Sequence, residues 1–334
     1  MGTNRTVRLV TRREVLQGAA AFAGGVVWAR VFPETLTAGV VPGYAQQPSA
    51  PPTDRVAAFR ARLGSNPIQA QELADNITML SGAGGNVVVL HGSDGKLIVD
   101  TFVSPAWPKL KAALAGFGKA PVRFAVDTHW HFDHADNNAP LHASGATVVA
   151  HENTKKRLSQ PHHLAVLELD FPPSPKAALP QQTFTDSHTL RANGETVALA
   201  HFPPAHTDTD IYVHFQKSNV LHVGDVFFNG MYPYIDGGTG GSVNGMIGAA
   251  DEILSLADQN TKIVCGHGPL GSKADVARCR DMLSTARDRV QKLKSAGRSM
   301  EEAAAAKPLA DLDPTWGKGL LDGDTFVQVV YLTL

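Results

Sequence analysis

The chain has 334 residues, of which 43% are hydrophobic and 18% are charged, and its formal net charge at pH 7 is -1. This composition is typical of a globular protein and excludes a disordered chain. Because 30 basic residues are balanced by 31 acidic ones, the chain has no excess of positive charge that would attract a polyanion. We therefore expect no nucleic-acid partner.

The first residues follow the order of an export signal. Arg12 and Arg13 precede an apolar run rich in Ala and Gly, which leads to small residues at Gly43 and Ala45 and then to a Pro-rich stretch. This order resembles a twin-arginine export signal, so we expect cleavage after Ala45 and an exported, periplasmic protein. The run is short and broken by glycines, so no membrane span is expected once the signal is removed. The alternative is an ordinary N-terminal helix with a chance arginine pair.

This interpretation divides the chain into a signal (1–45), a linker and N-terminal segment (46–75) and one folded domain (76–334). The domain alternates strand-like and helix-like patterns, in two halves that each begin with β-rich runs. Strands are expected within 76–82, 85–102, 121–129, 146–154, 182–186, 188–202, 210–225 and 261–268, and helices within 104–118, 153–158, 242–258 and 272–297. Residues 159–182 contain five prolines and are expected to form a long loop. Two similar halves suggest two sheets packed face to face with helices outside.

A short segment, DTHWHFDHADNN, concentrates candidate metal ligands at the end of one apolar strand. His129 and His131 are two residues apart, so on an extended backbone they point the same way. Asp133 and His134 follow, where the chain must turn into a helix. Imidazoles and carboxylates without thiolates suit Zn²⁺, Fe or Mn and argue against a structural zinc cage.

Three further candidates lie at the ends of later strands. His206 precedes the strand DIYVHF, Asp225 follows VLHVG, and His267 follows TKIVCG. Each stands beside Gly or Pro, where loop backbone can bring ligands to one edge of the sheets. A single histidine at any of these positions would usually be structural or exposed. The repeated placement at strand ends favours one shared metal site.

The pattern His129-x-His131-x-Asp133-His134, followed by His206, Asp225 and His267, resembles that of the metallo-β-lactamase superfamily. The match in order and spacing covers roughly residues 76–285. The resemblance implies an α/β fold, a four-layered αβ/βα sandwich, with a two-metal site between the sheets, so that 76–334 would be a catalytic domain.

By that resemblance, one divalent cation is held by His129, His131 and His206, the other by Asp133, His134 and His267, and Asp225 bridges both. Zinc is the expected metal, with iron or manganese as alternatives. Two cations about 4 Å apart share a hydroxide that attacks the substrate. Asp133 would orient this nucleophile or accept its proton, and is the expected catalytic residue. The implied reaction is hydrolysis of a small molecule with an ester-like, thioester, lactone or related bond.

True β-lactamases of this superfamily usually carry a cysteine or serine where Asp225 falls. In this respect the ligand set resembles more closely that of hydroxyacylglutathione hydrolase-like members, and β-lactam hydrolysis, as a minor or main activity, is an alternative. Phe228, Tyr232 and Tyr234 follow Asp225 and are the candidate substrate-binding residues. Cys265 is expected to be a buried thiol rather than a ligand, because the histidine and aspartate set is already complete. It is also expected to stay unpaired with Cys279, the only other cysteine.

Two other classes of protein stay open. Relatives on the same fold carry iron for redox chemistry, although the full set of ligands favours a dinuclear hydrolase. A protein that binds or scavenges metal without turnover is the second class, and a missing ligand would have supported it. The sequence does not indicate the oligomeric state.

Overall fold

The computed structural model describes residues 52–334, so the expected signal (1–45) lies outside the described residues. The described part contains two main β-sheets and a small third one. The seven-stranded sheet has the order β1-β2-β3-β4-β5-β6-β9. Its strands are β1 (Gln69–Ala74), β2 (Ile77–Ser81), β3 (Asn86–Leu90), β4 (Lys96–Val99), β5 (Val122–Val126), β6 (Thr147–His151) and β9 (Gln182–Phe184).

The five-stranded sheet has the order β10-β11-β12-β13-β14. Its strands are β10 (Ser187–Ala192), β11 (Glu195–His201), β12 (Ile211–Phe215), β13 (Val220–His222) and β14 (Lys262–Val264). The strands are antiparallel except for the last pair, because the α-helical connection between β13 and β14 returns the chain to the same end of the sheet.

The two large sheets pack face to face and share one apolar core. Val88 and Val99 of the first sheet and Val213 and Phe215 of the second belong to the same cluster of buried side chains. Inward-facing residues alternate with less buried ones along β11 and β12, as expected for strands with one face in a core. Phe215 is fully buried there.

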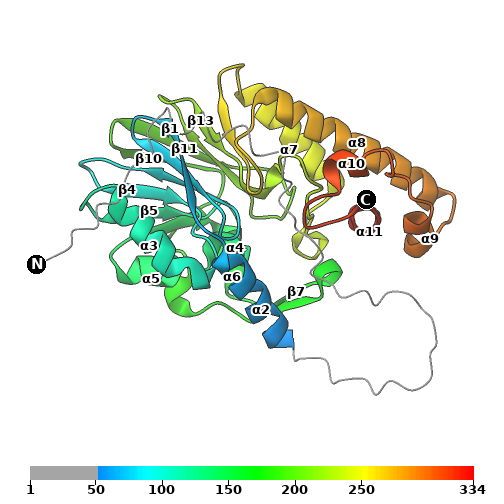
Figure 1. Cartoon of the computed structure of the whole chain (residues 1–334), viewed down its shortest axis with the longest axis horizontal. Coiled ribbons are helices and arrows are strands. Elements are labelled where there is room, and N and C mark those ends of the chain that lie inside the picture. The colour runs from blue at the N-terminus through cyan, green and yellow to red at the C-terminus, as the bar shows by residue number, and fades with distance from the viewer. Residues whose placement is uncertain (1–51) are drawn as a thin grey trace, which may run out of the picture. The chain divides into compact units, whose positions relative to one another are not determined.

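Helices cover the outer faces, with α3 and α5 beside the seven-stranded sheet and α7 and α8 beside the other (Figure 1). The helices are α2 (Pro52–Ser65), α3 (Trp107–Gly116), α4 (Phe132–Ala135), α5 (Asn138–Ala143), α6 (Glu152–Leu158), α7 (Val243–Leu256), α8 (Lys273–Ser295), α9 (Met300–Ala305), α10 (Asp313–Trp316) and α11 (Gly323–Thr333). The expected αβ/βα sandwich is therefore confirmed. Among residues 52–334, no helix is both long and apolar enough to cross a membrane.

The N-terminal segment before residue 76 contributes to this sandwich where it is described. Strand β1 pairs antiparallel with β2 at the edge of the first sheet. Most of its residues are exposed, as on many edge strands, so the sequence carries no apolar alternation there. Helix α2 is held to the C-terminal end of α4 by Arg60, whose Nε and Nη2 each donate at 2.7 Å to a carboxylate oxygen of Asp136, the residue that follows α4.

The expectation that 159–182 is a long, unpacked loop is wrong. Strands β7 (His162–Leu164) and β8 (Leu169–Phe171) pair antiparallel within it and form the small third sheet. Leu164 and Phe171 are buried. The prolines lie outside the paired strands, so they do not remove hydrogen bonds from this hairpin.

Asn86, the first residue of β3, joins the two sheets near one edge. Its Nδ2 donates to the carbonyl oxygens of Cys265 at 2.9 Å and Gly268 at 3.0 Å, and its backbone N–H donates to Gly266 O at 2.9 Å. Asn86 is only 2% exposed. The loop after β14 thus depends on a side chain of the opposite sheet.

We expect Asn86→Ala to lower the free energy of unfolding by about 2–3 kcal/mol, because one buried and one part-buried carbonyl group lose their donor. Asn66→Ala is the control, since Asn66 Nδ2 donates to Gly82 O in an exposed bond, and it should cost less than about 1 kcal/mol. Chemical denaturation of both variants measures the difference. Equal costs would contradict the role given to Asn86.

Candidate metal centre

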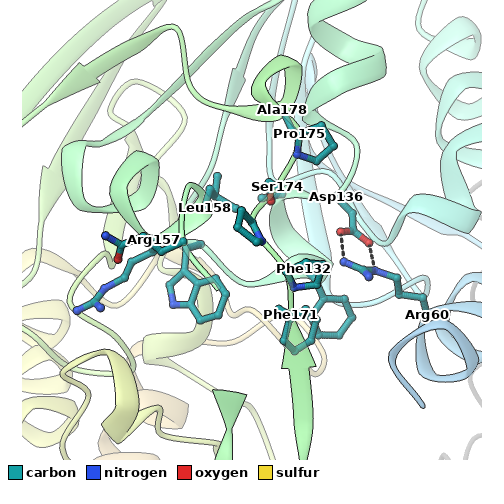
Figure 2. Close-up of a pocket in the computed structure, with 14 residues that line it drawn as sticks. Arg60, Phe132, Asp136, Arg157, Leu158, Phe171, Ser174, Pro175 and Ala178 are labelled. Carbon is teal, nitrogen blue, oxygen red and sulfur yellow. Dashed lines mark hydrogen bonds and ion pairs between the residues drawn. The ribbon is translucent and has the colours of Figure 1, made fainter. Parts of the chain in front are cut away.

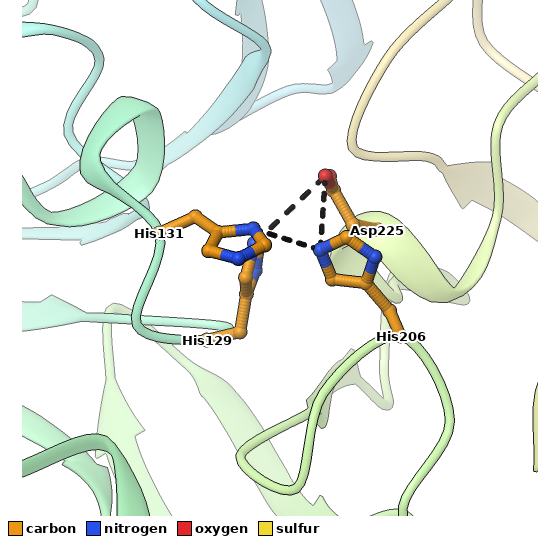
Figure 3. A group of neighbouring side chains, drawn as sticks. All are labelled: His129, His131, His206 and Asp225. Carbon is orange, nitrogen blue, oxygen red and sulfur yellow. Dashed lines mark hydrogen bonds and ion pairs between the residues drawn. The ribbon is translucent and has the colours of Figure 1, made fainter. Parts of the chain in front are cut away.

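All the histidines and aspartates that the sequence indicated as ligands come together at one edge of the two sheets. They form two neighbouring groups, and within each group the candidate ligand atoms lie within 4.8 Å of one another. The groups are His129, His131, His206 and Asp225 (Figure 3), and Asp133, His134 and His267.

The topology explains this convergence. Strands β4 and β5 are parallel, and so are β13 and β14. In each pair, the C-terminal ends of the two strands therefore lie on the same side of the sheet. His129 follows the end of β5, Asp225 follows β13 and His267 follows β14. The packing is close enough that a Cβ on Gly266 would lie 1.8 Å from Asp225 Oδ1, so only glycine fits at that position.

Asp225 connects the two groups and is 4% exposed. Its Oδ1 lies 3.2 Å from His134 Nε2. Its Oδ2 lies 3.3 Å from His267 Nε2, 3.5 Å from His206 Nε2 and 3.8 Å from His129 Nε2. One carboxylate therefore faces imidazoles of both groups, the position required of a shared ligand.

Outer partners fix the orientation of two of these imidazoles. Asp100 Oδ2 lies 2.7 Å from His134 Nδ1, and it also accepts from Thr128 Oγ1 at 2.9 Å. Thr128 Oγ1 in turn lies 3.1 Å from His129 Nδ1. Since the carboxylate can only accept, and the Thr128 proton is given to it, both ring Nδ1 atoms are donors. The Nε2 lone pairs of His129 and His134 therefore point inward.

Two more imidazoles are held by the loop after Asp225. His206 Nδ1 lies 2.8 Å from the carbonyl oxygen of Tyr234. His131 Nε2 lies 3.3 Å from Asp236 Oδ2, which leaves its Nδ1 facing inward. Ligand histidines in metalloproteins are oriented in this way, by a carboxylate or carbonyl on the nitrogen that does not bind the metal.

The inward atoms fit divalent cations. Among the described residues, His129 Nε2, His134 Nε2 and Asp225 Oδ1 are buried without a hydrogen-bond partner. Buried polar atoms without a hydrogen bond are costly, and the convergence of these three on one point offers a donor set to a cation. Asp100, Asp133, Asp225 and Asp236 are all buried. Two divalent cations would neutralise these four carboxylates.

The protonation of the rings follows from burial and from the carboxylates. Burial lowers the pKa of His206 to about 3 and moves the pKa of His129 well below its usual value. Burial acts in the same direction on His134 and His267. There the carboxylates outweigh it, Asp225 first, so the pKa of His134 is raised well above its usual value and that of His267 is raised.

The candidate substrate-binding residues divide into two kinds. Phe228 stacks on His267 with ring centroids 4.9 Å apart, and the ring of Tyr234 lies 6.2 Å from that of His206. Tyr232 points elsewhere: it is fully buried, and its ring stacks on Phe326 at 4.5 Å. The most exposed parts of the cluster belong to Asp133 and His267, whose side chains are 11% and 18% exposed.

Cysteine chemistry plays no part in this donor set. Cys265 and Cys279 are both buried and free. Burial raises the pKa of each thiol to about 12, so neither is a thiolate at neutral pH. Cys265 Sγ lies 3.3 Å from Pro269 O, as expected of a structural thiol.

A cavity of about 180 Å³ lies beside residues 129–134, which we call the metal-ligand segment (Figure 2). Trp130 and Phe132 line it, together with Phe171 of β8. Trp130 and Phe132 are sequence neighbours of the ligand histidines, yet none of the seven candidate ligands lines the cavity. Arg60 and Asp136 face each other at its side.

Sequence reasoning missed the outer partners. Asp100 carries a signal, because it directly follows the buried strand β4 beside the histidine-bearing β5. No sequence signal marks Asp236 or the Tyr234 carbonyl, because the sequence of a glycine-rich loop does not show which of its groups will face a histidine. Asn137, which follows the metal-ligand segment in the chain, donates through Nδ2 to the carbonyl oxygens of residues 101–103.

A sequence profile described as the Metallo-beta-lactamase superfamily matches residues 80–267. This range includes every residue of both groups. Comparison with curated protein sequences finds no significant match.

Solved structures with this fold are similar to the chain at low sequence identity. A metallo-beta-lactamase from Pontibacter korlensis is 17% identical, with a TM-score of 0.53, over 65% of this chain and 99% of that one. The DIM-1 metallo-beta-lactamase is 19% identical, with a TM-score of 0.53, over 66% and 98%. The sec-alkylsulfatase Pisa1 from Pseudomonas sp. is 16% identical, with a TM-score of 0.57, over 79% and 50%. These likenesses show a shared fold.

Metal affinity should rise with pH between about pH 5 and pH 8. Because the pKa values of His134 and His267 are raised, both rings hold a proton to higher pH than free histidine, and a cation must displace it. His129 and His206, with lowered pKa values, release none. Calorimetric titration of Zn²⁺ in buffers of different ionisation enthalpy measures the protons released. Binding without proton release and without pH dependence would contradict these electrostatics.

Proposed function

The chain belongs to the metallo-beta-lactamase superfamily, and on that premise we propose that it is a dinuclear, metal-dependent hydrolase of a small molecule. The observation that carries this proposal is the position of Asp225, which faces imidazoles of both ligand groups. A mononuclear site needs no carboxylate between two groups. The proposed metal is zinc, because nitrogen and oxygen donors in a buried, closely packed site suit it.

When bound, two such cations lower the pKa of water and polarise the bond to be hydrolysed. The chain's own residues supply the geometry. Asp133 is the candidate catalytic residue, since its carboxylate lies at the more exposed side of the cluster, 3.4 Å from His267 Nε2. In that position it can orient an attacking water and accept its proton.

The positions of Phe228 and Tyr234 are evidence for a substrate that is partly apolar. Both are aromatic, both lie beside ligand histidines, and Phe228 stacks directly on the more exposed His267. Both residues are nearly covered, at 3% and 6% exposed, so they act by making the surroundings of the proposed cations apolar, which favours a substrate with a hydrocarbon part. Ester-like, thioester and lactone substrates match this description.

Asp225 also bears on the choice among substrates. β-Lactamases of the superfamily usually carry a cysteine or serine at this position, so we propose β-lactam hydrolysis as a minor activity at most. The solved relatives include metallo-beta-lactamases and a sec-alkylsulfatase. Both β-lactams and secondary alkyl sulfates therefore belong in the test.

The activity test uses zinc-loaded protein and a panel of a lactone, a thioester, a phosphodiester, a secondary alkyl sulfate and a β-lactam. We expect a carbonyl substrate of the first two kinds to give the highest kcat/KM. Asp225→Ala should lower that value by more than about 100-fold, because both cations lose their shared ligand.

The control is Asp170→Ala, which removes an exposed carboxylate that pairs with His163 at 2.9 Å and belongs to neither ligand group. It should leave kcat/KM unchanged. The proposal fails if Asp225→Ala keeps the activity of the unaltered protein. Preference for the β-lactam over the other substrates would overturn the assignment of the substrate class.

We further propose export to the periplasm by a twin-arginine route, which rests on residues 1–45 of the sequence alone. This route carries folded proteins, and a protein with inserted metal ions would suit it.

Replacement of Arg12 and Arg13 by lysines should trap the protein inside the cell, because the route reads the arginine pair while the charge stays the same. Cell fractionation with immunodetection measures the distribution. Unchanged export of the Lys-Lys variant would contradict the proposed route.

A further inference from the structure

The loop between Asp225 and α7 contacts two ligand histidines from one short stretch. The Tyr234 carbonyl accepts from His206 Nδ1 at 2.8 Å, and the Asp236 carboxylate accepts from His131 Nε2 at 3.3 Å. The backbone N–H of Asp236 also donates to His206 O at 2.9 Å. We call residues 234–236 the bracing segment. Both histidines belong to the same ligand group, so this segment acts on one of the two proposed metal positions.

These contacts determine which nitrogen of each ring faces the metal position. A carbonyl oxygen can only accept, so His206 Nδ1 carries the proton and Nε2 has the free lone pair. The carboxylate of Asp236 likewise selects the His131 tautomer with the proton on Nε2. The two inward atoms, His206 Nε2 and His131 Nδ1, lie 2.9 Å apart. Two lone pairs at that distance repel unless a cation or proton lies between them.

Asp236 is itself held in place. It is 1% exposed, and Thr239 Oγ1 donates to its Oδ2 at 2.6 Å. Trp130 Nε1 lies 3.2 Å from the same hydroxyl oxygen. Trp130 stands between His129 and His131 in the sequence, so Thr239 connects the bracing segment back to the metal-ligand segment.

The bracing segment is anchored from its other side by C-terminal helices. Tyr232, two residues before it, donates through its hydroxyl to Asp313 Oδ1 at 2.9 Å, and its N–H donates to Trp316 O at 2.9 Å. Its ring stacks on Phe326 of α11, with 17° between the ring planes. Helices α10 and α11 follow the range that the family profile matches, which ends at residue 267.

We propose that Asp236 is a positioning residue for His131, and that Tyr232 transmits the support of α10 and α11 to the bracing segment. The C-terminal helices then act on one metal position, through His131 and His206, whereas no contact of the bracing segment reaches the position formed by Asp133, His134 and His267. This inference rests on the metal-binding part of the proposed function and is independent of which bond is hydrolysed.

The test measures binding of two equivalents of Co²⁺ to metal-free full-length protein, by competition with a chelator and by the visible absorption of bound Co²⁺. Asp236→Ala should weaken one equivalent by about 10- to 100-fold and change its absorption band, while the other equivalent stays within about 3-fold. Asp236→Asn should lie closer to the unaltered protein, because its carbonyl oxygen can still accept from His131.

Two milder variants test the anchor. Tyr232→Phe removes the part-buried hydrogen bond to Asp313 and Asp313→Asn weakens it, and each should weaken the same equivalent by about 3- to 10-fold. The control is Asp311→Asn, a neighbouring exposed carboxylate that pairs with Arg289. It should leave both equivalents unchanged. Thermal unfolding of each metal-free variant shows that the fold is retained.

Asp236→Ala with both affinities unchanged, or with both weakened equally, would overturn the inference. The same holds if Tyr232→Phe affects the equivalent that Asp236→Ala leaves intact. Failure of the proposed function has a different signature, since the unaltered protein would then bind fewer than two Co²⁺ ions or hydrolyse nothing on the panel.

Discussion

The placement of one buried carboxylate, Asp225, among imidazoles from both sheets is the constraint on which the rest of this structure depends. Its two oxygens lie 3.2–3.5 Å from His134, His206 and His267. A carboxylate buried to this extent requires compensating positive charge and matched donors. The parallel strand pairs deliver the ligands to one edge, Gly266 lets the backbone approach, and Asn86 fastens the loop that carries His267.

Oxygen atoms around the cluster orient its histidine rings, so that the inward nitrogen of each ring can bind a metal ion. Each of four rings has its outward nitrogen engaged by an oxygen, from Asp100, Thr128, Tyr234 or Asp236. The two metal positions are supported differently. Asp100, which follows a core strand, orients His134 directly and His129 through Thr128, whereas His131 and His206 depend on a loop held by C-terminal helices. This asymmetry gives the chain two separate means of setting metal affinity.

Much of the fold and of the ligand set could be predicted from the sequence, because both depend on local patterns. The spacing of the ligands between His129 and His134, and the positions of Asp225 and His267 after apolar strands, are visible in the sequence alone. What could not be predicted depends on distant contacts. Tyr232 looked like a pocket residue, yet its partner Asp313 lies 81 residues away. Strand β1 was hidden by its exposed edge position, and the β7–β8 hairpin by the prolines around it.

The measurement that tests the account most directly is anomalous X-ray scattering at the absorption edge of the bound metal in crystals of the metal-loaded protein. Two peaks about 3.5–4 Å apart are expected, one among His129, His131 and His206 and the other among Asp133, His134 and His267, with Asp225 between them. A single peak, or two peaks without Asp225 between them, would contradict it.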